Sequence, residues 1–482
     1  MVFADTTNPA PWQQLLGLAV ILAAIWAVVR EWEVRVVLSS AALTLGVIAG
    51  SPDVIVREFL ANFINEKFVI PLCCGMGFAH VLRHTGCDQH LVHLLVHPLS
   101  KVRFLLVPGT VIVGFLVNMP IVSQSSTAVT IGAVIIPILR AAGLSPVTTG
   151  AALLLGCSIG GELFNPGAPE VLTTFQVSQK AAMESPELNI DPTDFSATRC
   201  VQRLFPLNLI GLCAGTLAFW VIALLYERRQ TFVPTDVETA TSPLTLPPFG
   251  SFAGVLFLLR AVVPLFPLVL LYLCSYPFNL LEIDSAWLVS PALPAERAKE
   301  LMPTRLIGLA MVLGVVTAVL VTPKKLPGAG MAFFEGAGFG FGHIVSLIVV
   351  AQGFAKGIEL VGFAQTIAGL IEAFPGLLIP LAGFLALGFA FLCGSGMATT
   401  QGLFPFFAKP ALLLGVDPTH VGAVVSLAAA AGRTASPVAA VTLMCARMTG
   451  TKPLDLVKQV AIPVLISVAI IVLVAMIIAP TV

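Results

Sequence analysis

Apolar segments about as long as a membrane-crossing helix recur along almost the whole of this 482-residue chain. A helix needs about 20 apolar residues to span a bilayer, and the segments at 12–29, 204–225 and 252–273 approach or reach that length. Other apolar segments, such as 128–139 and 403–414, are too short to cross alone and are expected to form half-helices. The pattern predicts a polytopic membrane protein with about 10–12 transmembrane helices.

The composition excludes a soluble protein. Hydrophobic residues make up 57% of the chain and charged residues only 10%, against roughly a quarter in soluble proteins. The formal net charge is zero, which gives no indication of nucleic-acid binding. The nine cysteines lack the CxxC spacing of metal or redox sites, so we interpret them as packing residues. We expect no metal centre and no organic cofactor.

Two polar, interrupted segments occur at matching places in the two halves of the chain. Gly143-Leu-Ser-Pro146 corresponds to Gly415-Val-Asp-Pro418, and Asn165-Pro166 corresponds to Ser436-Pro437. The offset is near-constant at roughly 272 residues, which indicates an internal repeat. Interrupted apolar segments at corresponding positions of two halves are the best sequence pointer to the binding site of a carrier. The sequence leaves open whether the repeats are parallel or inverted.

A hydroxyl-rich cluster follows an apolar span in each repeat, as the turn of a helical hairpin would. The first cluster is Ser123-Gln-Ser125-Ser126-Thr127, and the second lies between Ser395 and Thr400. A helix N-terminus at such a turn offers unpaired N–H groups and a positive dipole end, which suit a carboxylate. Hydroxyls and free carbonyls at a broken helix can also hold Na⁺, for which Ser123, Thr127, Ser395 and Thr399 are candidates. The alternative is that these hydroxyls only bond to the preceding turn or join helices.

One acidic and one basic residue occupy equivalent positions in the two repeats. Counted back from the following proline, Glu162 and Arg433 stand at the same position. A charge at the centre of a membrane costs roughly 3 kcal/mol on insertion scales, so each side chain needs a partner. Arg433 could bind an anionic substrate through its guanidinium, or it could neutralise Glu162 and join the repeats. Glu162 could also carry a coupling proton.

The chain resembles a known family, the C subtype of the Dcu-type anaerobic C4-dicarboxylate carriers, within the ion-transporter superfamily. The similarity covers most of the chain, and the Gly432-Arg-Thr-Ala-Ser-Pro437-Val element is its most specific part. Glu162 departs from the family pattern, which tends to be apolar there. Further matching stretches are Gly394-Ser-Gly396, Gly353-Phe-Ala-Lys-Gly357, Val457-Lys-Gln-Val-Ala-Ile-Pro463, Ser125-Ser126-Thr127 and Asn165-Pro166-Gly-Ala-Pro-Glu170-Val.

This resemblance implies an all-α carrier with two inverted repeats, each with a re-entrant helical hairpin, in which a transport unit moves against a scaffold. The division expected is an N-terminal scaffold at 1–66, a first repeat at 67–225, a connector with scaffold helices at 226–342 and a second repeat at 343–482. The hairpins and broken helices are expected at 118–170 and 394–438. It further implies dicarboxylate substrates and a homodimer.

We therefore expect a secondary active transporter in the inner membrane that moves small carboxylates, most of all the C4-dicarboxylates fumarate, succinate and malate, by alternating access. The coupling ion, Na⁺ or H⁺, stays open. One alternative is a cation/proton antiporter of the same superfamily that uses Glu162, and another is an intramembrane hydrolase that uses Ser158. The residues expected to bind substrate are Ser125, Ser126, Thr127, Asn165, Gly396, Thr399, Thr400, Arg433, Thr434 and Ser436.

Overall fold

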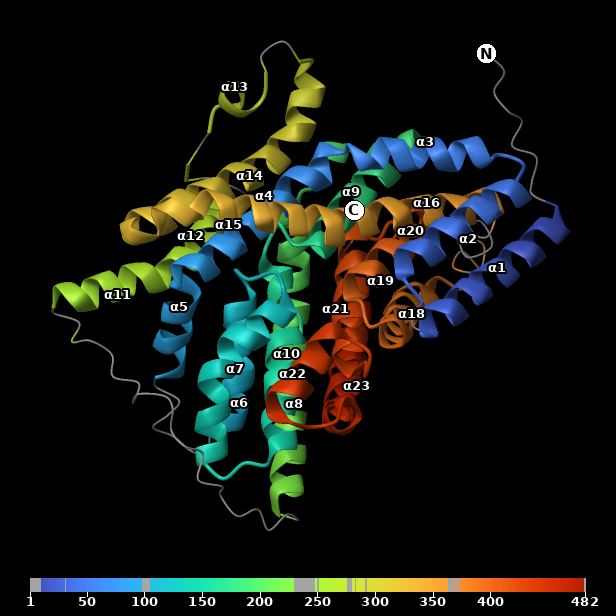
Figure 1. The fold of residues 1–482 in the computed structure, drawn as a ribbon. Coiled ribbons are helices and arrows are strands. Elements are labelled where there is room, and N and C mark those ends of the chain that lie inside the picture. Colours follow the sequence, from blue (N-terminus) through green and yellow to red (C-terminus); the bar gives the residue numbers. More distant parts are fainter. Residues whose placement is uncertain are drawn as a thin grey trace.

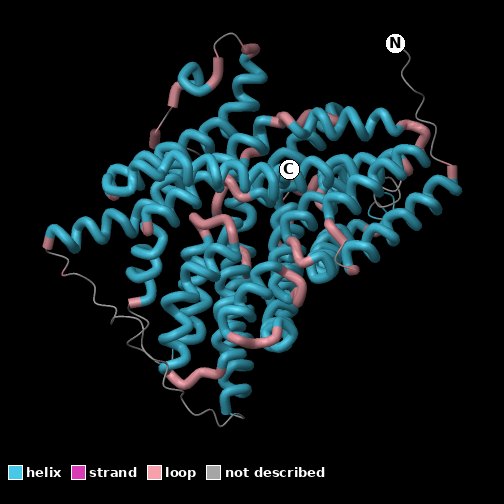
Figure 2. Tube along the Cα trace, in the orientation of Figure 1, coloured by secondary structure: helices cyan, strands magenta, loops and turns pink. Residues whose placement is uncertain are grey.

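The computed structural model describes residues 10–30, 32–97, 105–228, 248, 251–274, 280–281, 283–290, 293–362, 369, 371 and 373–480. Helices joined by turns and loops make up this part of the chain, and no strand occurs in it (Figure 2). Nine helical segments among these residues are long and apolar enough to cross a membrane. The expected all-α membrane fold is therefore confirmed. Residues 229–247 of the predicted connector lie outside the described residues.

The helices follow one another from the N-terminus at the blue end of Figure 1 to the C-terminus at the red end. Those of the first half are α1 (Pro11–Val29), α2 (Val34–Ile48), α3 (Pro52–Phe63), α4 (Glu66–Thr85), α5 (Cys87–Val96), α6 (Leu106–Asn118), α7 (Gln124–Ala141), α8 (Pro146–Ser158), α9 (Pro169–Met183) and α10 (Ala197–Arg228). Short turns in this half are η3 (Gly161–Phe164), η4 (Pro186–Leu188) and η5 (Pro192–Asp194).

The second half contains a similar succession. Its helices are α11 (Phe252–Val262), α12 (Phe266–Leu273), α13 (Ser285–Leu288), α14 (Ala295–Val321), α15 (Leu326–Gly340), α16 (Ser346–Leu360), α18 (Leu378–Cys393), α19 (Gly396–Leu403), α20 (Pro405–Leu413), α21 (Pro418–Ala435), α22 (Ala440–Thr449) and α23 (Pro453–Ile477). Its short elements are η6 (Val263–Leu265), η7 (Pro323–Lys325), the π-helical η8 (Phe341–Val345) and η9 (Pro375–Leu377).

Each half contains a helical hairpin followed by a broken helix and a long apolar helix. In the first half these are α6–α7, α8–α9 and α10; in the second they are α18 with α19–α20, α21–α22 and α23. The first hairpin arm α6 has 13 residues and is therefore roughly 20 Å long, too short for a hydrocarbon core of about 30 Å. The first hairpin therefore turns inside the apolar layer. In the second half the segment Pro375–Cys393, which contains α18, has 19 residues and is long and apolar enough to cross a membrane.

Proline and glycine make the breaks in α8–α9 and α21–α22. Gly160 has φ 109°, in the left-handed region that glycine adopts without a side-chain clash, and it ends the α8 segment. Pro169 then occupies the first turn of α9, where the missing N–H costs nothing. In the second half Ser436 is extended and Pro437 follows it, so α21 stops at Ala435. The sequence itself therefore determines where both helices are interrupted.

The two broken helices run side by side in opposite directions. The segment before the first break, α8, packs against α22, which follows the second break, and α9 packs against α21. In Figure 1 α8, α21 and α22 lie together with α7, α10 and α23 in the lower, upright part of the molecule, and α9 lies above them. This antiparallel crossing is the arrangement that inverted repeats produce.

Helices α2–α4 and α14–α16, which come before the two hairpins in the chain, form a second layer, which lies across the upright part in Figure 1. Helix α4 packs against α14 and α15, and α16 packs against α2 and α3, so the two halves use the same arrangement. The junction between α3 and α4 at Ile64–Asn65 corresponds to the π-helical turn η8, with an offset of roughly 276 residues. The duplication in the structure thus includes α2–α3 and α14–α15.

Glycines at repeat-related positions allow the first hairpin arm to touch the broken helix. A Cβ atom added to Gly161 would lie 2.3 Å from the carbonyl oxygen of Phe115 in α6. A Cβ atom added to Gly432 would lie 2.2 Å from the carbonyl oxygen of Leu387 in α18. Since these positions directly precede Glu162 and Arg433, the close contacts set the depth of both charges in the core.

We predict that Gly432→Ala destabilises the fold by about 2–3 kcal/mol, because its methyl group would clash with backbone that cannot move independently. Gly388→Ala is the matched control, since it lies on α18 and a Cβ atom there would meet nothing within 4 Å. The measurement is the thermal unfolding midpoint of both purified variants in one detergent. Equal midpoints would contradict the assigned close contact.

Candidate functional site

A cavity of about 310 Å³ lies between the two hairpin turns, the two helix breaks and the second layer of helices. Both repeats contribute to its wall, as do α4, the end of α15 and η8. Its lining residues are Met76, Val122, Ser123, Gln124, Ser125, Pro169, Glu170, Phe339, His343, Ile344, Gly394, Ser395, Gly396, Met397, Arg433, Ala440 and Val441.

Four helix N-termini border this cavity. Residues in the first turn or at the N-cap of α7, α9, α19 and α22 all belong to its wall. Ser123 caps α7 by accepting from the Ser126 N–H at 3.4 Å, and Ser395 caps α19 by accepting from the Ala398 N–H at 3.2 Å. Each N-terminus carries about half a positive charge and unpaired N–H groups. The cavity is therefore suited to an anion.

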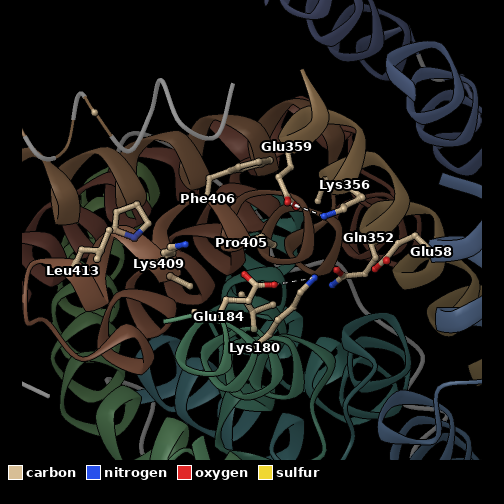
Figure 3. A pocket seen from close by; sticks show the side chains of 16 residues that line it. Glu58, Lys180, Glu184, Gln352, Lys356, Glu359, Pro405, Phe406, Lys409 and Leu413 are labelled. Atoms are coloured by element: carbon tan, nitrogen blue, oxygen red, sulfur yellow. Dashed lines mark hydrogen bonds and ion pairs between the residues drawn. The ribbon is translucent and has the colours of Figure 1, made fainter. Parts of the chain in front are cut away.

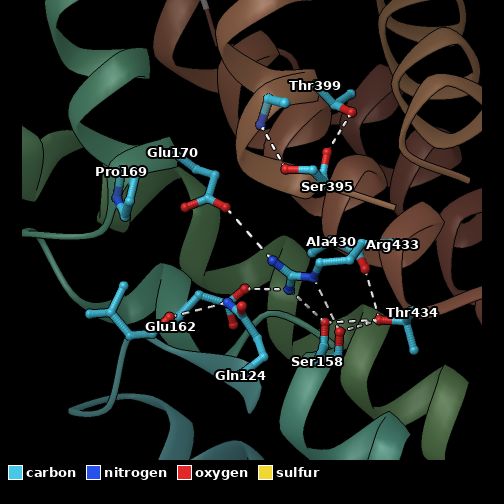
Figure 4. A network of polar contacts seen from close by, with 12 residues as sticks. Gln124, Ser158, Glu162, Pro169, Glu170, Ser395, Thr399, Ala430, Arg433 and Thr434 are labelled. Carbon is cyan, nitrogen blue, oxygen red and sulfur yellow. Dashed lines mark hydrogen bonds and ion pairs between the residues drawn. The ribbon is translucent and has the colours of Figure 1, made fainter. Parts of the chain in front are cut away.

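Arg433, only 6% exposed, places its guanidinium between the two breaks (Figure 4). Nη2 donates to Glu162 Oε1 at 2.6 Å and to the Ser158 carbonyl at 3.0 Å, and Nε donates to Ser158 Oγ at 3.2 Å. The neighbouring Thr434 hydroxyl also donates to the Ser158 carbonyl, at 2.9 Å. These contacts join the end of α21 to the end of α8.

Glu162 is fully buried and anchored in the first repeat. Besides the Arg433 pair, it accepts a hydrogen bond from the Asn118 amide at the end of α6. The Asn118 side-chain oxygen accepts in turn from the Thr127 hydroxyl at 3.1 Å, at the start of α7. The ion pair that mutual neutralisation requires is present between the repeats, and Arg433 is also part of the cavity wall, as substrate binding requires.

A second carboxylate, Glu170, faces the same guanidinium from the first turn of α9. Its Oε1 lies 3.8 Å from Arg433 Nη1, and the side chain is almost fully buried (Figure 4). Sequence reasoning did not select Glu170 as a site residue. The available signal was its position directly after Pro169, in the first turn of the half-helix that follows the break.

The predicted substrate-binding residues separate into two groups. Ser125, Gly396 and Arg433 belong to the cavity wall, together with the proposed Na⁺ candidates Ser123 and Ser395. The others lie behind the wall or beside it, and most of them bind neighbouring groups. The Thr127 hydroxyl donates to the Ser123 carbonyl at 3.1 Å, and the Thr399 hydroxyl donates to the Ser395 carbonyl at 2.7 Å. The Asn165 amide donates to the Met119 carbonyl at 3.3 Å, and the Thr434 hydroxyl donates to the Ser158 carbonyl. The Ser126 hydroxyl accepts from Arg83.

Thr400 and Ser436 are buried, and their hydroxyls have no hydrogen-bond partner among the described residues. The bonds of Thr127 and Thr399 are equivalent in the two hairpins, since each hydroxyl binds the carbonyl of the capping serine four residues earlier. These contacts stabilise the turns whose N–H groups border the cavity. Na⁺ binding at these positions stays a prediction.

A larger cavity of about 430 Å³ lies elsewhere, between α3 and α16 on one side and α9 and α20 on the other (Figure 3). Charged side chains at its edge pair locally, with Lys356 and Glu359 2.7 Å apart and Lys180 and Glu184 3.9 Å apart. The helix breaks and hairpin turns do not border it. We therefore assign the candidate site to the smaller cavity, where the buried charges and helix N-termini converge.

We predict that Arg433→Met destabilises the protein by about 3–5 kcal/mol, because it leaves Glu162 buried without a counter-charge. Glu162→Gln costs less, since Glu170 still faces Arg433. The double variant Glu162→Gln/Arg433→Met recovers part of the loss, and thermal unfolding of the four proteins measures this coupling. Additive losses in the double variant would contradict a direct ion pair.

Comparison with known proteins agrees with this architecture. The family model of the C4-dicarboxylate anaerobic carriers, DcuC, matches residues 64–171 and 258–480. An uncharacterised transporter of Haemophilus influenzae is 36% identical over 130 residues, which cover 27% of this chain and 90% of that protein. The anaerobic C4-dicarboxylate transporter DcuC of Escherichia coli K12 is 23% identical over 414 residues, or 84% of this chain and 78% of that protein.

Two solved transporter structures share the fold. MtrF of Neisseria gonorrhoeae, described as one of a class of antimetabolite efflux pumps, superposes with a TM-score of 0.53 at 16% identity, over 88% of this chain and 84% of its own. The YdaH transporter of Alcanivorax borkumensis gives a TM-score of 0.55 at 16% identity, over 97% and 98%. The relatives are transporters, so a hydrolase reaction at Ser158 is set aside. With its repeats, its apolar helices and a family match over most of its length, this chain belongs to the DcuC family of anaerobic C4-dicarboxylate carriers and is a secondary transporter of the inner membrane.

Proposed function

We propose that this protein carries small C4-dicarboxylates, such as fumarate, succinate and malate, across the membrane by alternating access. The observation that supports the proposal best is the cavity where four helix N-termini and the Arg433 guanidinium converge. Carboxylates bind favourably at helix N-termini and to arginine. The substrate class follows the family description and the Escherichia coli relative.

The shape of the site suits a molecule with a carboxylate at each end. Helices α7 and α19 are repeat-related, and so are α9 and α22, so each repeat contributes two N-termini to the cavity. A C4-dicarboxylate has the same two-ended symmetry, and each of its carboxylates would meet one set of N–H groups. The cavity volume of about 310 Å³ is at the lower end of ligand sites, which favours a small substrate.

The same packing supports a movement of one layer against the other. The hairpins and broken helices form a unit with many mutual contacts, whereas α4, α15 and η8 belong to the layer that lies across it. Both cavities lie between these two layers. In the proposed transport step the unit with the hairpins carries the bound dicarboxylate along the second layer. The homodimer implied by the family resemblance stays a proposal.

The experiment is uptake of labelled succinate, fumarate, malate and citrate into proteoliposomes, with Na⁺ and pH gradients varied separately. Uptake of the C4 acids in preference to citrate is the expected result. Cation exchange driven by a pH gradient without any organic anion would favour the antiporter alternative instead. Absence of dicarboxylate binding and transport under every gradient would overturn the proposed function.

We predict that Gly396→Ala weakens dicarboxylate binding by about tenfold, or about 1.4 kcal/mol. A Cβ atom at this position would lie 3.2 Å from Arg433 Nη1 and would occupy part of the cavity at the second hairpin turn. The measurement is the equilibrium dissociation constant of fumarate for the purified protein.

Gly402→Ala is the matched control for this prediction, because Gly402 is on the same helix and a Cβ atom there would meet nothing within 4 Å. The control should bind fumarate like the unmodified protein. If Gly396→Ala also binds fumarate with unchanged affinity, the substrate does not occupy this cavity.

A further inference from the structure

The buried side chains around the candidate cavity include more acidic than basic groups, which is unfavourable for an anionic substrate. Within the described residues two buried carboxylates, Glu162 and Glu170, face a single buried guanidinium, that of Arg433. With both carboxylates ionised, these three side chains carry a net negative charge. A dicarboxylate that enters the cavity would then meet repulsion at close range in surroundings that screen charge poorly.

The two carboxylates differ in how firmly they are held. Glu162 pairs with Arg433 at 2.6 Å and also accepts from Asn118. The carboxylate of Glu170 has its one charged contact at 3.8 Å from Arg433 Nη1, beyond hydrogen-bond distance. Glu170 also belongs to the cavity wall, whereas Glu162 does not. A change in protonation therefore disturbs less of the structure at Glu170 than at Glu162.

Ionised Glu170 and a bound dicarboxylate would compete for the same groups. Arg433 Nη1 is the part of the guanidinium closest to Glu170, while Nη2 and Nε bind Glu162 and Ser158. The N-terminus of α9, which could bind a substrate carboxylate, already has the Glu170 side chain in its first turn. A proton on Glu170 removes this competition and leaves both groups available to the substrate.

We propose that Glu170 takes up a proton when the dicarboxylate binds and releases it with the substrate on the other side, so that the carrier is proton-coupled through Glu170. The inference rests on the proposed function and identifies its coupling ion. It assigns the titrating role to Glu170 in place of Glu162, whose partners hold it as a fixed counter-charge. Binding of the proton and the dianion is then mutually favourable, as linkage requires.

Other ionisable groups near Glu170 are few within the described part of the chain. Arg433 on α21 and Glu162 on η3 face it, and His343 on η8 lies in the cavity wall with its ring exposed. The cavity-lining residues of α4 and α19, which also pack on α9, are uncharged. On α10, Arg199 and Arg203 bind Asp417. Lys180 near the end of α9 pairs with Glu184 just beyond it. Glu187 on η4 and Asp194 on η5 are exposed, and Lys409 on α20 lines the larger cavity.

The test measures fumarate binding to the purified protein between about pH 6 and pH 8.5, where fumarate remains a dianion because carboxyl groups titrate near pH 4. We expect the affinity of the unmodified protein to fall by up to about tenfold per pH unit in the alkaline part of this range, as for one linked proton. In weak buffer, binding should take up about one proton per fumarate.

Glu170→Gln mimics the protonated side chain. It should bind fumarate with an affinity that no longer depends on pH and without proton uptake. In proteoliposomes it should exchange labelled for unlabelled fumarate but lose uptake driven by a pH gradient. Glu170→Asp should restore part of the pH dependence, and Glu187→Gln, an exposed acid beyond the end of α9, should behave like the unmodified protein.

Three results would overturn the inference: pH-dependent binding that persists in Glu170→Gln, pH dependence that disappears in His343→Gln, and fumarate binding by the unmodified protein that is independent of pH and takes up no proton. In each case the dicarboxylate function itself would stand. If the unmodified protein binds no dicarboxylate at any pH, while Glu170→Gln and Glu187→Gln unfold at the same temperature as it does, the proposed function fails instead.

Discussion

The structure depends on the pairing of Glu162 with Arg433 in an apolar interior. Neither charge is stable there alone, because removing an ion from water costs several kcal/mol unless a partner and hydrogen bonds replace the lost solvation. Glu162 and Arg433 are each other's partner at 2.6 Å, and hydrogen bonds from Arg433 to Ser158 and from Asn118 to Glu162 replace further solvation. Since one charge comes from each repeat, the requirement for pairing brings the two helix breaks to one place.

The two helix breaks also provide free backbone N–H groups at the cavity. A continuous helix satisfies all its internal N–H groups and offers no polar backbone to a ligand, whereas an interrupted helix presents the free N–H groups of its new first turn. Here α9 and α22 begin at the breaks, and α7 and α19 begin at the hairpin turns. The Ser123 and Ser395 side chains satisfy one N–H group each. The other N–H groups at these four helix N-termini border the cavity, so an anion site arises although Arg433 is the one arginine or lysine in its wall among the described residues.

The hairpin turns and the equivalent positions of Glu162 and Arg433 could be predicted from the sequence, because Gly, Pro and charged residues stand out against an apolar background. It left open which partner Arg433 takes, and the observed ion pair with Glu162 is one of the two alternatives it considered. It did not single out Glu170, whose importance depends on the approach of α9 to α21. It also grouped Asn165 and Thr434 with the cavity residues, although their side chains bind the backbone at Met119 and Ser158.

The sequence by itself determined that this chain crosses the membrane many times, that it is duplicated, and where its helices are interrupted. These features depend on local composition, since apolar length, proline and glycine act on the segment that contains them. Only the tertiary structure decided which side chains face the cavity and which face each other. A helix exposes a different residue to each neighbour, and the antiparallel crossing of α8–α9 and α21–α22 alone determines that Arg433 meets both Glu162 and Glu170.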